Sequence, residues 1–92
     1  MNESTLPEIK NDIVWRKEGS KQNIVSISSC NGGPIWLLNP VASRIIELLN
    51  EGNTVKDIIE DISFNFEVNY EEIKVDVINF LLSLQKRGII KL

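Results

Sequence analysis

Apolar and polar residues follow two different periods along this chain, and the change of period divides it into two parts. Before Pro40 the apolar residues form short runs and alternations, which are typical of strands. This pattern predicts three strands, over Ile13–Arg16, Asn23–Ser28 and Ile35–Leu38. From Pro40 onward the apolar residues recur at the spacing of amphipathic helices. The order of elements predicts an α+β fold in which a three-stranded antiparallel sheet is followed by three helices.

Polar residues at the start of each helical stretch indicate where the helices begin. Asn39 is a strong N-cap and a proline follows it, which predicts a first helix over Pro40–Asn50. Thr54 with Asp57 resembles a capping box and predicts that a second helix begins there. A third helix is expected over Tyr70–Arg87, because an asparagine precedes it and a glycine follows it.

The two ends of the chain are less regular. Residues 1–12 are polar and net acidic, and we expect them to form a flexible N-terminal arm. Residues 13–92 would then form a single domain. The last four residues, Ile89–Leu92, are expected either to add a short closing strand or to pack on the core as a tail.

The predicted third helix carries two apolar faces. At about 100° per residue, one face is an ordinary core stripe. Its members are Ile73, Val77, Phe80, Leu81 and Leu84. Val75, Ile78 and Leu82 lie on a second arc, roughly opposite the first. Either the third strand or the C-terminal tail covers this arc, or the arc forms one wall of a groove whose other wall is the open edge of the third strand. A peptide could occupy such a groove by pairing with that edge.

Composition excludes several classes of function. The chain has 92 residues, no histidine and one cysteine, Cys30. It therefore lacks the commonest general base and any set of cysteines that could hold a metal, so we expect no metal, no cofactor and no catalysis by the isolated chain. A net charge of −3 argues against a surface for nucleic acid. No apolar run is long enough to span a bilayer, and a cytoplasmic protein is expected.

A dispersed pattern of turn and apolar residues runs through most of the chain. It comprises Leu38-Asn39-Pro40 with Ala42, Ile45, Leu48 and Leu49, then Thr54-Val55 with Ile58, and finally Asp76-Val77, Phe80-Leu81, Leu84 and Gly88. In this pattern the chain resembles the PqqD-like proteins. The resemblance implies a winged-helix-like domain known as a RiPP recognition element. Such a domain binds the leader segment of a ribosomally made precursor peptide and presents it to a modifying enzyme.

The resemblance also implies partners and a site. The enzyme would be a radical S-adenosylmethionine protein, as in pyrroloquinoline quinone biosynthesis, or alternatively a lasso-peptide protease. The implied peptide-binding residues form a strand wall and a helix wall. They are Ile35, Trp36, Leu37 and Leu38 on the strand, and Val75, Ile78, Asn79 and Leu82 on the helix. Because side chains alternate along a strand, either Trp36 or the pair Ile35 and Leu37 faces the groove.

Two other classes of function remain as alternatives. A winged helix that binds DNA would use the third helix for recognition, but its exposed candidates include Glu71, Glu72 and Asp76, which would repel phosphates. A plain interaction or dimerisation module would use the same apolar patch. We expect a monomer or a weak homodimer.

Overall fold

Three strands form a small antiparallel sheet near the start of the chain. In the computed structural model, residues 2–18, 24–29 and 36–92 are described. Strand β2 (Ile13–Glu18) pairs with β3 (Ile24–Ser29), and β3 pairs on its other side with the short strand β4 (Trp36–Leu37). The predicted antiparallel order is confirmed. Ile35 and Cys30 lie outside the described residues.

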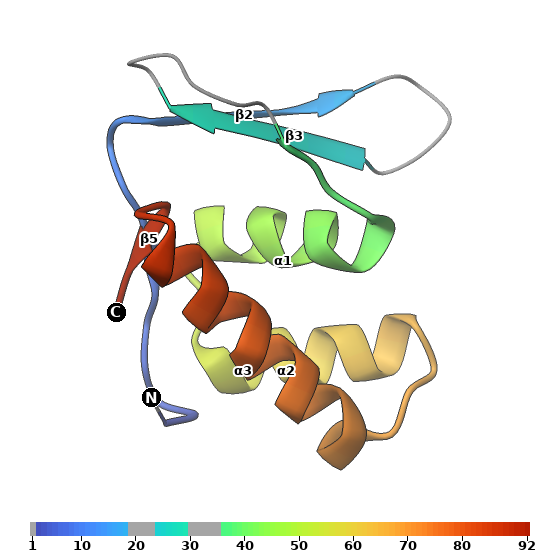
Figure 1. The fold of residues 1–92 in the computed structure, drawn as a ribbon. Helices are drawn as coiled ribbons and strands as arrows, with labels where there is room; N and C mark the ends of the chain where they lie inside the picture. Colours follow the sequence, from blue (N-terminus) through green and yellow to red (C-terminus); the bar gives the residue numbers. More distant parts are fainter. Residues whose placement is uncertain (1, 19–23, 30–35) are drawn as a thin grey trace.

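Three helices follow the sheet, as predicted. They are α1 (Pro40–Asn50), α2 (Val55–Asn65) and α3 (Tyr70–Lys86). Figure 1 shows the strands β2 and β3 lying over α1, with α2 and α3 on the far side of α1. None of these helices, within the part of the chain that the structure describes, is long and apolar enough to cross a membrane.

Each helix begins at the cap that the sequence indicates. Asn39 accepts a hydrogen bond from the backbone N–H of Ala42 at its Oδ1 atom, 2.8 Å away. Thr54 and Asp57 form a reciprocal capping box, with both hydrogen bonds at 3.2 Å. At the C-terminal end of α3, Gly88 adopts a φ of 76°, a left-handed conformation that glycine reaches without a steric cost.

The core lies between the inner faces of the three helices and the sheet. Its fully buried side chains come from all three helices, from β3 and from the C-terminal strand. The largest are Ile27, Ile45, Ile46, Ile58, Ile59, Ile62, Leu81, Leu84, Ile89 and Ile90. The predicted core stripe of α3 is confirmed at Ile73, Val77, Leu81 and Leu84, whereas Phe80 is only half-buried.

The two ends of the chain pair with each other. Strand β1 (Glu8–Ile9) runs antiparallel to β5 (Ile90–Lys91), and the N–H of Lys10 donates to the carbonyl of Ile89 at 3.0 Å. The tail thus forms the closing strand that was one of the two expectations. Its partner comes from the segment that was expected to be a flexible arm. The strand count is therefore higher than predicted, with a second, two-stranded sheet.

The segment before β1 packs on the start of α2. The N–H groups of Val55 and Lys56 donate to the carbonyls of Thr5 and Glu3, both at 2.9 Å. The first N–H groups of a helix have no partner within the helix, so this segment satisfies two of them. The Glu3 carboxylate also accepts a hydrogen bond from the Tyr70 hydroxyl at 2.9 Å. Residues 3–10 are therefore part of the folded unit, in contrast to the predicted loose arm.

Candidate functional site

Strand β4 is the edge of the three-stranded sheet. The strand order is β2-β3-β4, so β4 pairs with β3 on one side, and no described strand pairs with its other side. An edge strand presents backbone N–H and C=O groups that can pair with another chain. The edge comprises Trp36 and Leu37 and continues into Leu38, which is half-buried against the core.

The end of this edge is held firmly to α1. Ser43 is completely buried, and its Oγ donates to the carbonyl of Leu38 at 3.1 Å. The N–H of Ser43 donates to the carbonyl of Asn39 at 2.8 Å. These bonds fix the direction in which the chain leaves β4 and enters α1. Sequence reasoning missed Ser43, although a serine within an apolar helix stripe, four residues after an N-cap, is a signal for such a bond.

A pocket of about 310 Å³ opens where β4 passes into α1. It lies between the first turns of α1 and the middle of α3, and its lining is mostly apolar. The lining residues are Asn39, Val41, Ala42, Ile45, Ile73, Asp76, Val77 and Phe80. An apolar pocket with a few polar groups, next to an open strand edge, is suited to bind the side chain of an extended peptide whose backbone pairs with that strand.

The structure does not place the predicted helix wall in this pocket. Val75 and Leu82 are 58% and 44% exposed, and neither lines the pocket. Ile78 is half-buried and Asn79 is exposed, and they too lie outside the lining. The α3 residues that do line the pocket occupy one edge of the core stripe. Of these, sequence reasoning missed Asp76 and assigned Phe80 wholly to the core.

Helix geometry explains this difference. At about 100° per residue, Asp76 and Phe80 lie on the side of the core stripe that faces α1, whereas Val75 and Leu82 point away from the core. The apolar spacing of α3 shows that two faces exist. Which of them borders the pocket depends on where α1 packs, and that is a tertiary property.

Of the two charged residues near the pocket, the acidic one lines it and the basic one is bound to α2. Asp76, which lines the pocket, is exposed and forms no ion pair with another described residue. Arg44, in the next turn of α1, is instead bound to α2, where its Nε and Nη2 atoms donate to the two carboxylate oxygens of Asp61 at 2.9 and 2.8 Å. The hydrogen bonds from this guanidinium lower the pKa of Asp61. The rim of the pocket therefore carries a negative charge.

No metal centre accompanies the pocket. Among residues 2–18, 24–29 and 36–92, no three His, Cys, Asp or Glu side chains lie close enough together to hold a metal ion.

The comparisons with known proteins point to one family. The sequence model described as "Coenzyme PQQ synthesis protein D (PqqD)" matches residues 23–90, which is most of the chain. The chain belongs to the PqqD family. The matched range runs from β3 to β5, so it includes the edge strand β4 and the two helices, α1 and α3, whose residues line the pocket. A search of curated protein sequences finds no significant match.

Two solved structures share the PqqD-family fold with this chain. One is TbiB1 in complex with the TbiA(beta) leader peptide, with a TM-score of 0.80 and 24% identity over 91% of this chain and 94% of that one. The other is the PqqD truncation of Methylobacterium extorquens PqqCD, described as a functional, stand-alone RiPP recognition element. Its TM-score is 0.77, with 16% identity over 99% of this chain and 94% of that one. Together they confirm the predicted fold class.

Proposed function

We propose that this chain binds the leader segment of a ribosomally synthesised precursor peptide and presents the peptide to a modifying enzyme. The observation that carries the proposal is the open edge of β4 beside the apolar pocket. Membership of the PqqD family supports it, as does the likeness to a protein solved with a leader peptide. The enzyme would be a radical S-adenosylmethionine protein or a lasso-peptide protease, and this chain would contribute no chemistry of its own.

The leader would bind as an added strand. Its backbone would pair with Trp36 and Leu37, which gives affinity without depending on sequence. One of its apolar side chains would enter the pocket and provide specificity. At about 310 Å³, the pocket is at the small end of the ~300–1,000 Å³ range of ligand sites, a size that suits a peptide side chain.

The helix wall of this proposed site is the stripe of Asp76 and Phe80. The predicted strand wall remains part of the proposal, and Asn79 lies at the border between the pocket side of α3 and its outer face. The carboxylate of Asp76 disfavours an acidic leader residue beside the pocket, because like charges would then be brought together at a partly desolvated surface.

The structure offers less support for binding DNA. A recognition helix should present basic and amide side chains to the grooves. The exposed side chains of α3 include Glu71, Glu72 and Asp76 along with Val75 and Leu82. Carboxylates and aliphatic groups on that helix would repel or ignore a phosphate backbone.

Nuclear magnetic resonance tests the proposal directly. The isotope-labelled chain is titrated with a synthetic leader segment of a candidate precursor peptide. We expect the largest amide shifts at Trp36, Leu37 and Leu38 and at the pocket residues of α1 and α3. Intermolecular backbone contacts across β4 should show an added strand. Shifts confined to α2, or an absence of binding at millimolar peptide, would contradict the proposal.

A further inference from the structure

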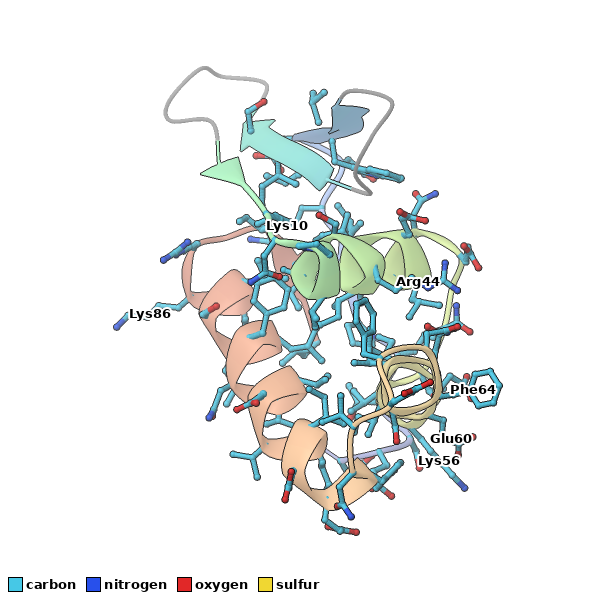
Figure 2. All side chains as sticks on the ribbon, turned by 90° about the vertical axis from the view of Figure 1, so that its right-hand side faces the viewer. Lys10, Arg44, Lys56, Glu60, Phe64 and Lys86 are labelled. Carbon is cyan, nitrogen blue, oxygen red and sulfur yellow. The ribbon has the colours of Figure 1, made fainter. Side chains whose placement is uncertain are left out.

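The outer face of α3 is an apolar surface that the pocket does not use. Val75 and Leu82 are 58% and 44% exposed at its centre. In Figure 2, α3 forms one lateral edge of the molecule, with the packed core on its inner side, and Lys86 extends away from the body. These two side chains lie two helical turns apart on one face of α3, with the half-buried Ile78 and the exposed Asn79 between them.

This face has an internal symmetry. Taking the point between Ile78 and Asn79 as the centre, Val75 and Leu82 lie at equal distances on either side. Glu71 and Lys86 also lie at equal distances, one helical turn further out. At about 100° per residue, all these positions fall on the side of α3 that points away from the core. Positions at equal distances from the centre therefore carry matching kinds of residue, aliphatic near the centre and charged at the ends, and the two end charges are opposite.

We propose that this outer face binds the same face of a second copy of the chain, with the two α3 helices antiparallel. A twofold axis between Ile78 and Asn79 would place Val75 against Leu82 of the second copy. The same axis would place Glu71 opposite the second copy's Lys86. The proposal goes beyond leader binding and does not rest on it.

Charge complementarity favours a second copy as the occupant. Glu71 and Lys86 are exposed, and neither forms an ion pair with another described residue. A twofold interface makes every contact twice, so one antiparallel pair of helices gains two ion pairs and two Val–Leu contacts. A parallel pair would instead bring Glu71 against Glu71 and Lys86 against Lys86, which is repulsive.

The size of the face predicts a weak dimer. Each copy contributes the outer face of one 17-residue helix, so the buried area is below the ~1,200–2,000 Å² of stable interfaces. The pocket opens on the α1 side of α3, so a dimer leaves the proposed leader site accessible. Self-association should therefore appear only at high concentration, whether or not a leader is bound.

Sedimentation equilibrium from micromolar to millimolar concentration tests the proposal with the full chain. The wild type should show a reversible monomer–dimer equilibrium. The single variants Glu71→Lys and Lys86→Glu should each weaken dimerisation about tenfold or more, because each replaces two attractions with two repulsions. The double variant, with both changes in one chain, should recover most of the affinity.

The double variant separates dimerisation from helix stability. An acidic residue at the start of a helix and a basic residue at its end both stabilise the helix dipole. The double variant reverses both, so its helix should be less stable than that of either single variant, as measured by thermal melts. Recovery of dimerisation despite lower helix stability can come only from pairing across the twofold axis. Failure to recover would overturn the antiparallel register.

A matched control uses the other strongly exposed apolar helix residue. Phe64 is 82% exposed at the end of α2, and Figure 2 shows it pointing into solvent. Leu82→Glu should abolish dimerisation, whereas Phe64→Glu should leave it unchanged. The opposite result would place the interface on α2. A wild type that stays monomeric at millimolar concentration would also overturn the proposal, and loss of enzyme binding by Leu82→Glu would then assign the face to the modifying enzyme.

Discussion

The two faces of α3 are built from the same kinds of residue but differ in what lies against them. On the inner face, Ile73, Val77 and Leu81 pack against the other helices, and the edge of that face borders the pocket. On the outer face, Val75 and Leu82 meet solvent. An apolar helix face is therefore no guide to a binding site until its neighbours are known. The first two predictions below test this contrast, and the later ones test the contacts that hold α1 and the start of α3 in place.

The sharpest test compares two adjacent leucines. Leu81 is completely buried, whereas Leu82 is 44% exposed. Leu81→Ala should lower the free energy of unfolding by about 2–5 kcal/mol, because it leaves a cavity in the core. Leu82→Ala should change it by less than about 0.5 kcal/mol at low protein concentration. Urea denaturation measures both. Equal losses would show that the outer face is part of the core.

A second test fills the pocket without introducing a charge. Val41 lines the pocket and is half-buried, so Val41→Trp should occupy the space meant for a leader side chain. Loss of that buried contact, worth about 1.5–3 kcal/mol, should weaken leader binding by ten- to about a hundredfold in calorimetry. Leu82→Trp places the same side chain on the outer face and should leave leader affinity unchanged. If Leu82→Trp were the variant that loses the leader, the outer face would be the true helix wall.

A third test concerns the link that positions α1, the opposite wall of the pocket. The Asp61 carboxylate binds the Arg44 guanidinium of α1 through two hydrogen bonds. Both side chains are partly exposed, so Asp61→Asn should cost only about 1 kcal/mol at neutral pH. Glu60→Gln, which removes an exposed ion pair with Lys56 on the same helix, is the control and should have a smaller effect.

The pH dependence of this link has a definite sign. The hydrogen bonds from Arg44 lower the pKa of Asp61 below its ordinary value of 3.8 in the folded state. The link is therefore fully stabilising above about pH 4, and its contribution is lost as the pH falls through the lowered pKa. Urea denaturation at pH 7 and pH 3 should show the Asp61→Asn variant losing less stability on acidification than the wild type. Equal losses of stability in the two proteins would show that the Arg44–Asp61 interaction does not stabilise the fold.

The last test is read as a titration midpoint and concerns the first turn of α3. Tyr70 is the only tyrosine of the chain, so its ionisation can be followed by ultraviolet absorbance. Burial and the hydrogen bond to Glu3 raise the pKa of Tyr70 to about 12. The neutral phenol is thus favoured in the folded state, and this stabilisation is lost as the pH rises from 10 through about 12. Glu3→Gln should move the midpoint toward 10, and a wild-type midpoint near 10 would show that the N-terminal segment is not docked.

Local patterns in the sequence were enough to predict most of the fold. The bounds of α1 match the prediction, because Asn39 and Pro40 define its start within a few residues of chain. The capping box at Thr54 is equally local. The pairing of β1 with β5 could not be predicted in this way. Glu8 and Lys91 lie opposite each other in the sheet but at opposite ends of the sequence, and neither segment alone has a strong strand pattern.

For the candidate site too, local features were predictable from the sequence and tertiary ones were not. By itself the sequence determined that β4 would be followed directly by a helix and that α3 would have two apolar faces, because both depend on spacing within a single segment. Only the tertiary structure decided that Asp76 and Phe80 border the pocket while Val75 and Leu82 remain outside it. The physical reason is that helical periodicity fixes the angle between two faces of a helix, whereas the position of α1 across the pocket from α3 decides which face borders the pocket.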